Sequence, residues 1–341
     1  MTLGQSSQLA AALTTEANWN MAASDDSATA MLGRTDLRVP RLGMGVMVWG
    51  DLSTAPRWNP ARNAYGPTSS LDDQREALQV SLAAGVNLLD TAAMYGKGSS
   101  ERRVGELTEG NDEILVATKF PASFFATTGS LPEALDASLA RLRRKVVDLY
   151  QVHYPSRWMS IPRLMNLMAD AVEAGKVRAV GVSNYSAAQM RFAHAELGRR
   201  GIPLASNQVQ YSLLHRNPES DGVLATCREL GITLIAYMPL ASGALTGKYS
   251  AANRPAGWRK NMPMFRGKGM VRIERVTHVL REIGDRHGKK PSQVALRWLL
   301  QQPGVLPIPG AKSGAQAAAN AGALTFALTE DELRTLADAT A

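Results

Sequence analysis

The sequence predicts an α/β protein built as a single closed (β/α)8 barrel, also called a TIM barrel. Eight short apolar segments recur along the chain, and a helical pattern or a long loop separates each from the next. The segments are apolar almost without interruption, which is typical of parallel strands that are covered on both faces. Eight such units in about 300 residues fit a barrel better than an open sheet with a second domain.

The expected strands are, in chain order, residues 43–48, 86–89, 113–118, 146–151, 177–182, 204–210, 232–237 and 305–308. Between them, apolar residues recur at helical spacing. Several of these helices open with a capping box, in which a serine and the residue three positions later satisfy each other's backbone N–H groups. The clearest capping boxes are Ser70 with Asp73, Ser130 with Glu133, and Ser186 with Gln189. Two short apolar segments around Val39 and Pro40 predict a hairpin before the first strand.

The chain has 341 residues, of which 45% are hydrophobic, and we expect one domain over residues 31–341. Residues 1–30 are rich in Ala, Ser and Thr and contain no Lys or Arg. They therefore lack the basic region of a signal peptide and the arginines of a transit peptide. We expect a flexible tail there, and a translation start at Met21 or Met31 would fit the same pattern.

Charge, hydropathy and cysteine content argue against several classes of function. The net charge is +8, but Lys and Arg are dispersed and no reader motif accompanies them, so we expect no nucleic-acid partner. The positive field would still attract a phosphorylated cofactor. No run of about 18 apolar residues predicts a membrane span. Cys227 is the only cysteine, so no disulfide can form within the chain, which fits a reducing, cytoplasmic location. No residues near Cys227 resemble a metal site. A monomer is the default expectation.

Polar side chains follow nearly every expected strand. In chain order they are Asp90, Lys119, His153, Ser183 with Asn184, Gln208, Tyr237 and Lys312. The carboxyl-terminal strand ends of such a barrel gather at one end, where functional residues lie. Taken singly, Asp90 fits a turn cap, Lys119 a surface lysine and His153 a satisfied core histidine. Packing alone would rarely place such groups at successive strand ends, so we interpret them as one site.

At these positions the sequence closely resembles the aldo-keto reductase family. The segment LLDTAAMYG matches the family signature around its acid and tyrosine, ATKF carries its lysine, and VHYP carries its histidine. The family's serine and asparagine lie in VGVSN, and its glutamine lies in SNQVQYS. The loop over the pyrophosphate is matched by LIAYMPLASGALTGKY, and the segment on the adenosine side is matched by PIPGAKSGAQAAANAGAL. The resemblance covers residues 33–341, and the order of the widely separated motifs makes it specific.

The resemblance implies reduction of an aldehyde or ketone, with Tyr95 as proton donor. A free tyrosine has a pKa near 10, so a tyrosine acid works best when a nearby cation such as Lys119 favours the tyrosinate. Asp90 is expected to keep Lys119 charged and oriented. His153 is expected to donate a hydrogen bond to the carbonyl oxygen of the substrate.

NADPH is the cofactor that the resemblance implies. Ser183, Asn184 and Gln208 would bond the carboxamide of its nicotinamide, and Tyr237 would stack on the ring. The other residues that the resemblance assigns to the cofactor are Pro239, Leu240, Gly243, Leu245, Lys248, Gly310, Lys312, Ser313, Gln316 and Asn320.

The motif after the last strand bears on the choice between NADPH and NADH. Lys312 is its only full charge, because Gln316 stands where many relatives carry an arginine. We therefore expect a moderate preference for NADPH. Gln316 also has the spacing of a capping partner for Ser313, and both roles are compatible. Ala319 stands where relatives usually have an acidic residue for the adenine amino group, so the resemblance does not supply that contact.

The substrate pocket is less clear from sequence. Trp49 and Trp158 are the expected lining residues, although packing or loop anchoring would explain either one. The chain ends soon after the last predicted helix, so the long carboxyl-terminal loop of some relatives is missing, which predicts an open pocket for varied or bulky carbonyl compounds.

Three other interpretations of the sequence compete with this one. A redox-sensing subunit like the potassium-channel β subunits of this family would bind NADPH but turn over slowly. A barrel glycosidase needs two carboxylates at strand ends, and only Asp90 qualifies. A dinucleotide fingerprint at Gly43 and Gly45 fails, because no third glycine or helix follows at the required spacing.

Overall fold

The computed structural model describes residues 28–50, 69–121 and 130–340. Its centre is an eight-stranded sheet in which the strands follow one another in chain order and every neighbouring pair is parallel. The strands are β3 (Met44–Gly45), β4 (Leu88–Asp90), β5 (Leu115–Phe120), β6 (Val147–Val152), β7 (Val177–Ser183), β8 (Leu204–Gln210), β9 (Thr233–Tyr237) and β10 (Val305–Pro307). A parallel bridge joins Gly45 to Gly310, so the first strand meets the chain just after the last, and the barrel closes. This confirms the predicted fold class.

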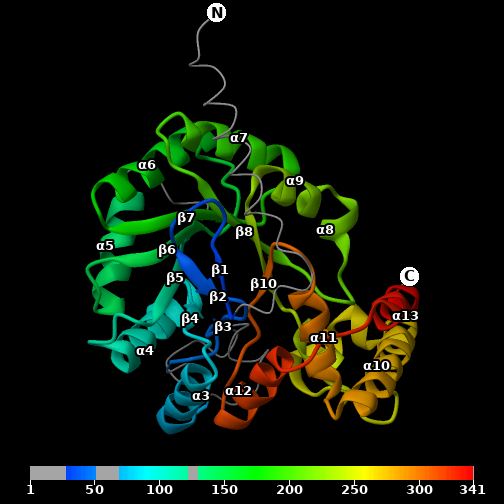
Figure 1. Cartoon of the computed structure of the whole chain (residues 1–341). Coiled ribbons are helices and arrows are strands. Elements are labelled where there is room, and N and C mark those ends of the chain that lie inside the picture. Colours follow the sequence, from blue (N-terminus) through cyan, green and yellow to red (C-terminus); the bar gives the residue numbers. More distant parts are fainter. Residues whose placement is uncertain (1–27, 51–68, 122–129, 341) are drawn as a thin grey trace, which may run out of the picture.

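Helices surround the barrel on its outside (Figure 1). They are α3 (Leu71–Ala83), α4 (Ser99–Thr108), α5 (Ser130–Leu142), α6 (Ile161–Glu173), α7 (Ala187–Gly198), α8 (Asn217–Ser220), α9 (Val223–Leu230), α10 (Gly267–His287), α11 (Pro291–Leu300), α12 (Gly314–Ala321) and α13 (Glu330–Thr340). The loop between β9 and α10 contains three short 3-10 helices, η2 (Ala241–Thr246), η3 (Gly257–Asn261) and η4 (Pro263–Phe265). A further two, η1 (Tyr95–Gly98) and η5 (Gly322–Leu324), follow β4 and α12.

Capping residues explain where several helices begin. Complete capping boxes form at Ser70 with Asp73 and at Ser186 with Gln189, as the sequence predicts. The Thr329 hydroxyl accepts from the N–H of Glu332 at 3.2 Å ahead of α13. Each cap satisfies N–H groups that have no partner inside the helix, and so it fixes the direction in which the chain leaves the preceding loop.

A two-stranded antiparallel hairpin, β1 (Thr29–Met31) with β2 (Arg38–Pro40), covers the amino-terminal end of the barrel. Leu32, Leu37 and Val39 from this hairpin share one apolar cluster with inward-facing residues of the lower barrel; these include Leu88, Ala117, Leu149, Ala179 and Ile235. The barrel interior is therefore packed and apolar at this end. Functional side chains are therefore expected at the opposite end, where the strands end.

The predicted boundaries are correct to within a few residues, with two exceptions at the start of the chain. The first strand is only Met44–Gly45, because the chain turns directly after it and the N–H of Trp49 donates to the Val46 carbonyl at 2.9 Å. The expected tail over residues 1–30 overlaps the hairpin, since Thr29 and Ala30 pair with β2. Residues 1–27 of that tail lie outside the described part of the chain.

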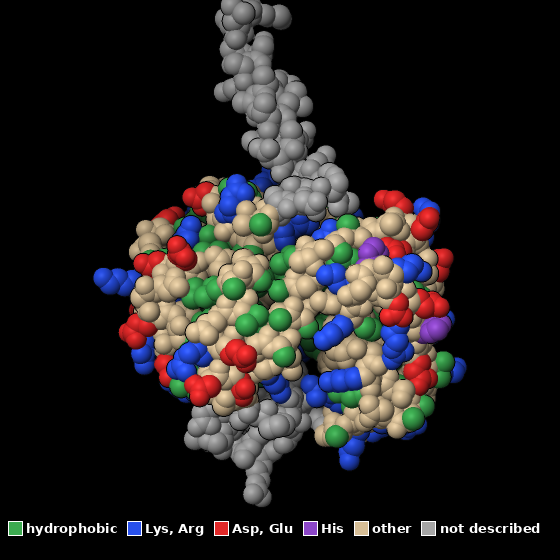
Figure 2. Space-filling view, turned by 60° about the horizontal axis from the view of Figure 1, so that its bottom comes forward, with side chains coloured by type: hydrophobic (Ala, Val, Ile, Leu, Met, Phe, Trp, Pro, Cys, Tyr) green, Lys and Arg blue, Asp and Glu red, His purple; other side chains and the backbone are tan. Residues whose placement is uncertain are grey.

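The charged surface agrees with the dispersed pattern of the sequence. Figure 2 shows Lys and Arg side chains interspersed with Asp and Glu over this face of the molecule. Among the helices that the structure describes, none is long and apolar enough to cross a membrane.

Candidate active site

The barrel interior changes from apolar to polar toward the carboxyl-terminal strand ends. Inward-facing positions alternate along each strand, so an apolar residue in the lower layer is followed two positions later by a polar one. Leu88 is followed by Asp90 on β4, Ala117 by Lys119 on β5, and Leu149 by Gln151 on β6. The strands thus deliver a ring of buried polar side chains to one end of the barrel, as the sequence predicts.

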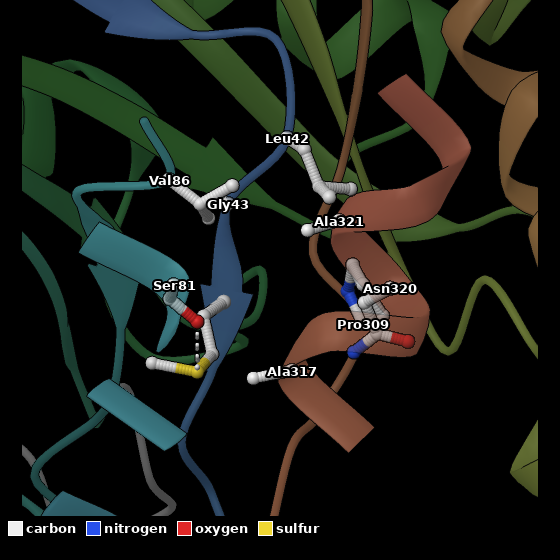
Figure 3. Close-up of a pocket in the computed structure, with 9 residues that line it drawn as sticks. Leu42, Gly43, Ser81, Val86, Pro309, Ala317, Asn320 and Ala321 are labelled. Atoms are coloured by element: carbon white, nitrogen blue, oxygen red, sulfur yellow. Dashed lines mark hydrogen bonds between the residues drawn. The ribbon is translucent and has the colours of Figure 1, made fainter. Parts of the chain in front are cut away.

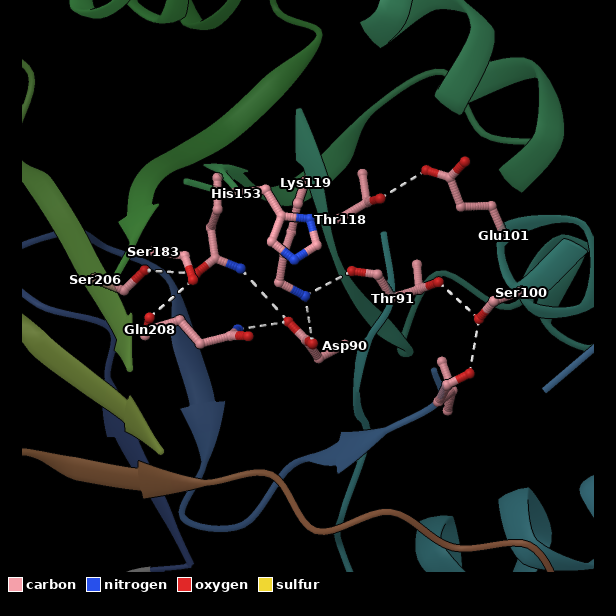
Figure 4. A network of polar contacts seen from close by, with 12 residues as sticks. Asp90, Thr91, Ser100, Glu101, Thr118, Lys119, His153, Ser183, Ser206 and Gln208 are labelled. Carbon is pink, nitrogen blue, oxygen red and sulfur yellow. Dashed lines mark hydrogen bonds and ion pairs between the residues drawn. The ribbon is translucent and has the colours of Figure 1, made fainter. Parts of the chain in front are cut away.

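Asp90 and Lys119 form a buried ion pair at the centre of this ring (Figure 4). The Lys119 ammonium donates to Oδ1 of Asp90 at 2.6 Å and to the Thr91 carbonyl at 2.8 Å. Burial lowers the pKa of Lys119, and the charge and hydrogen bond of Asp90 oppose that lowering. The charge on Lys119 therefore depends on how Asp90 is held.

Tyr95 lies at the start of η1, the first short helix after β4. The Lys119 Nζ lies 5.1 Å from the centre of the Tyr95 ring. The Tyr95 ring meets the His153 ring edge to face, with centroids 5.7 Å apart and planes at 84°. Gly96, Lys97 and Gly98 all have positive φ values, so the chain turns sharply after the tyrosine. Asp90, Tyr95, Lys119 and His153 are thus brought together.

His153 follows β6 and is almost fully buried. Burial, and then the charge of Lys119, lower the pKa of His153 to about 3. The imidazole is therefore neutral at ordinary pH and has one N–H to donate. Its Nδ1 has no hydrogen-bond partner among the described residues. Tyr154 stacks on the imidazole with ring centroids 4.8 Å apart.

Four residues expected at the nicotinamide form one hydrogen-bonded group. The Asn184 amide donates to Ser183 Oγ at 3.0 Å and to the His153 carbonyl at 3.1 Å, while its Oδ1 accepts from the Tyr237 hydroxyl at 3.0 Å. The Ser183 hydroxyl donates to the Gln208 carbonyl at 2.8 Å. Asn184 has φ of +62°, a left-handed conformation that asparagine tolerates better than most residues. The group links the strand ends of β7, β8 and β9.

The loop after β9, expected over the pyrophosphate, has an unusual backbone. Met238, Ala241 and Ser242 have positive φ although none is glycine, and Gly243 has φ of +88°. Such conformations are costly and often accompany binding sites. The expected residues Pro239, Leu240, Leu245 and Lys248 lie in or beside this loop.

Lys312 is half-buried, and two other cations, Arg259 and Lys248, lie near it. Burial, and then the charges of Arg259 and Lys248, lower the pKa of Lys312. Arg259 is held in place by a 3.0 Å hydrogen bond from its Nε to the Ser242 carbonyl. Mutually repelling cations at one place suit an anionic group such as a phosphate. Arg259 was not anticipated from the sequence, because it lies in a long polar loop without a motif.

The segment after β10 follows the capping geometry that the sequence predicts. Ser313 is the N-cap of α12, and its side chain accepts from the N–H of Gln316 at 3.4 Å. The Gln316 Oε1 accepts from the Lys312 N–H at 2.9 Å, so this glutamine has a capping role. Asn320 donates to the Gly310 carbonyl at 3.2 Å. Whether Ser313, Gln316 and Asn320 also contact a cofactor stays a prediction.

The two tryptophans expected to line the pocket differ. Trp49 is fully buried, and its indole N–H donates to the Ala311 carbonyl at 2.8 Å. This anchors the loop after β10 and agrees with the packing role, while a lining role for Trp49 stays a prediction. Trp158 is 69% exposed on the loop that follows His153. With Met94 and Tyr154, it is one of three exposed large apolar side chains in the segments after β4 and β6.

A small cavity lies at the seam of the barrel, beside Asn320 but away from the four catalytic candidates (Figure 3). It is lined by residues of the first strand region, α3 and α12, which include Gly43, Ser81, Ala317 and Asn320. None of Asp90, Tyr95, Lys119 or His153 contributes to it. We therefore treat it as a packing defect beside α12.

Sequence reasoning also missed the supports of the ion pair. Gln151 is fully buried, and its Nε2 lies 3.4 Å from Oδ2 of Asp90. Its position two residues before His153 on β6 was a usable signal, since alternation places both on the inner face. The Thr91 hydroxyl shares a 2.8 Å hydrogen bond with Ser100, which donates to the Val46 carbonyl at 2.7 Å.

A second buried carboxylate, Glu101, holds strand β5 in place from outside the barrel. Glu101, on α4, accepts from the Thr118 hydroxyl and from the Arg141 Nε, each at 2.6 Å. Thr118 directly precedes Lys119, so this contact fixes β5 beside the ion pair. Figure 4 shows both networks on either side of β5. Among the described residues, no group of His, Cys, Asp and Glu side chains could hold a metal ion.

Comparisons with known proteins agree with this geometry. The sequence profile of the Aldo/keto reductase family matches residues 41–341. An uncharacterised oxidoreductase of Mycobacterium tuberculosis is 39% identical over 304 residues, which cover 89% of this chain and 90% of that protein. The chloroplastic pyridoxal reductase of Arabidopsis thaliana is 38% identical over 314 residues, covering 87% and 82%.

Among solved structures, the fold resembles glycerol dehydrogenase from Gluconobacter oxydans. The TM-score is 0.78 at 26% identity, and the match covers 92% of this chain and 94% of that one.

Proposed function

The chain belongs to the aldo/keto reductase family, whose members use NADPH or NADP+, and on that premise we propose that it reduces an aldehyde or ketone to the alcohol with Tyr95 as general acid. The observation that carries the proposal is the buried Asp90–Lys119 pair beside the Tyr95 ring, with the His153 ring at its edge. A structural role alone would not require a buried lysine next to a tyrosine that borders the open end of the barrel.

Each of the four residues has a task that follows from its surroundings. NADPH, when bound, supplies the hydride to the carbonyl carbon. The Tyr95 hydroxyl gives its proton to the carbonyl oxygen, and the neighbouring Lys119 ammonium favours the tyrosinate that remains. Neutral His153 donates a hydrogen bond to the same oxygen and so orients the carbonyl group. Asp90 holds Lys119 in place and compensates its charge.

The donor set also suits the cofactor. Ser183, Asn184 and Gln208 carry hydroxyl and amide groups that match both the donor and the acceptor of a carboxamide. Lys248, Arg259 and Lys312 would hold the phosphates, because their mutual repulsion is relieved by an anion. Tyr237, positioned by Asn184, would cover the nicotinamide ring.

The substrate class stays open among small carbonyl compounds. Exposed Met94, Tyr154 and Trp158 near the catalytic group would favour substrates with an apolar or flat surface. Aromatic aldehydes and pyridoxal therefore lead the candidates, the second because of the Arabidopsis thaliana relative. Sugar-derived ketones and secondary metabolites complete the range. A cytoplasmic location, a monomeric state and a domain boundary near residue 30 stay predictions.

A redox-sensing subunit with slow turnover is the second candidate. The complete set of Asp90, Tyr95, Lys119 and His153 favours the enzyme. The test is NADPH oxidation, followed by the loss of absorbance, with a panel of these carbonyl compounds. Turnover of at least one compound is the expected result. Tight NADPH binding with negligible turnover on every compound would support the sensor instead.

A further inference from the structure

Asp90 has two carboxylate oxygens, and the structure gives them different partners. Oδ1 accepts from the Lys119 ammonium at 2.6 Å. Oδ2 accepts from the Gln208 Nε2 at 2.8 Å, and the Gln151 Nε2 lies 3.4 Å from it. Figure 4 shows Gln208 and Lys119 approaching the Asp90 carboxylate from different directions. The two glutamines come from β6 and β8, and both are buried, so water does not replace them.

The orientation of the Gln151 amide is fixed by chemistry. An ionised carboxylate only accepts hydrogen bonds, so the amide must present its NH2 group to Asp90. The carboxamide oxygen of Gln151 then faces the other way, where it accepts from the Ser206 hydroxyl at 3.4 Å. Gly181 leaves the space for this contact, because a Cβ there would lie 2.3 Å from Ser206 Oγ and 3.1 Å from Gln151 Cγ.

Gln208 has a second task in the proposed reaction, and Gln151 does not. Gln208 is the amide expected to bond the carboxamide of the nicotinamide. Any turn of its side chain toward the cofactor weakens its hydrogen bond to Asp90. Gln151 lies one layer deeper, bonded to Ser206, and is not expected to contact the cofactor. It is therefore the donor that can stay on Asp90 while the cofactor is bound.

We propose that Gln151 is a positioning residue of the reaction, which holds the second oxygen of Asp90 so that the first stays paired with Lys119 when Gln208 engages the cofactor. This rests on the proposed function. Asp90 supports the charge on Lys119, and Lys119 favours the Tyr95 tyrosinate. Loss of the Gln151 amide frees the carboxylate to turn, weakens the ion pair, and makes Tyr95 a weaker acid.

The alternative is that Gln151 only fills space in the barrel. The two roles differ in what they do to the pH dependence. Gln151→Met keeps the shape of the side chain and removes both amide groups. The matched control is Gln301→Met, which removes a buried glutamine that bonds the Leu328 backbone far from Asp90. Both variants lose buried hydrogen bonds, so both should melt at lower temperature than the unmutated protein.

The first readout is oxidation of an alcohol with NADP+, a direction in which Tyr95 must act as the base. Gln151→Met should move the midpoint of the rising alkaline limb up by about one pH unit, which corresponds to about a tenfold loss of kcat/KM below it. Gln301→Met should leave the midpoint unchanged. An unshifted midpoint in Gln151→Met, whatever its kcat, would overturn the proposal. An equal shift in both variants would overturn it as well.

The second readout needs no substrate. Tyrosinate absorbance is titrated in the protein saturated with NADP+, and subtraction of a Tyr95→Phe titration under the same conditions isolates Tyr95. The midpoint should rise in Gln151→Met. If no carbonyl compound is reduced but this midpoint rises, the proposed function fails and the positioning role stands. If Gln151→Met does not fold, Ser206→Ala should raise the midpoint by a smaller amount, and no rise there would contradict the proposal.

Discussion

The Nζ of Lys119 lies 2.6 Å from Oδ1 of Asp90, and neither side chain is more than 5% exposed. The barrel creates this contact. Asp90 is paired in register with Ala117 on the neighbouring strand, and Lys119 is the next residue on the same inner face. Two charges at adjacent strand ends thus face each other inside a closed barrel. The proposed catalytic role of the site depends on this pair.

Removal of one charge from the pair should strongly destabilise the protein. Asp90→Asn keeps the shape but leaves the Lys119 ammonium buried without a counter-ion, which is expected to cost about 3–5 kcal/mol of unfolding free energy. Asp72→Asn is the control, because Asp72 pairs with Arg75 on the surface. That variant should change stability by less than about 0.5 kcal/mol. Urea denaturation measures both, and similar losses in the two variants would contradict the account.

His153 should make the folded protein less stable as the pH falls. Its pKa is about 3 in the folded protein against about 6.5 when unfolded, so below about pH 6.5 the unfolded state binds the extra proton. Folding stability from this group is complete above pH 6.5 and is lost as pH falls toward the folded value. By pH 5 the loss should reach about 2 kcal/mol.

The comparison that isolates this effect uses two histidine variants. Between pH 7 and pH 5, the unmutated protein should lose stability more steeply than His153→Gln. His278→Gln should keep the steep slope, because His278 is exposed. Parallel curves for the unmutated protein and His153→Gln would show that His153 is not buried in its neutral form.

The cation cluster should set the choice between NADPH and NADH. A charge-assisted contact to the extra phosphate is worth about 1.5–3 kcal/mol, or roughly ten- to a hundredfold. Lys312→Ala should therefore largely erase a moderate NADPH preference, with NADH kinetics little changed. Arg259→Ala should weaken NADPH use in the same direction, and Lys145→Ala, at a distant surface site, should have no effect. Equal kcat/KM for both cofactors in the unmutated protein would contradict this prediction.

Gly33 should be required for the hairpin to pack against the amino-terminal end of the barrel. This residue has φ of +60°, its N–H donates to the Thr233 hydroxyl at 2.8 Å, and an added Cβ would lie 2.5 Å from the Ala205 carbonyl oxygen. Gly110→Ala is the matched control, with φ of +74° and open space around it. The control should cost about 1–2 kcal/mol for the left-handed backbone alone. Gly33→Ala should cost about 1–3 kcal/mol more because of the clash. Equal losses in thermal unfolding would mean that the hairpin can shift.

Local sequence patterns predicted most of the fold. Continuous apolar strands and capping boxes depend on neighbours in the chain, so β8 and the Ser186 capping box appear as expected. The position of Asp90, Lys119 and His153 at strand ends also follows from alternation. Contacts between residues on opposite parts of the barrel could not be predicted from such local patterns. Gln151 reaches Asp90, and Trp49 bonds Ala311, only because distant strands meet on closure. Arg259 sits in a loop whose course no local pattern fixes.

The role of Tyr95 as proton donor is tested most directly by Tyr95→Phe, measured as turnover of a carbonyl substrate together with NADPH affinity. A general acid typically contributes 10²–10⁴-fold, so turnover should fall by about that factor while the NADPH Kd stays within about threefold of the unmutated value. Tyr150→Phe is the control, since that hydroxyl is buried on the outer face of β6 without a partner among the described residues, and it should leave turnover unchanged. Retention of more than about a tenth of the turnover in Tyr95→Phe would contradict the central claim.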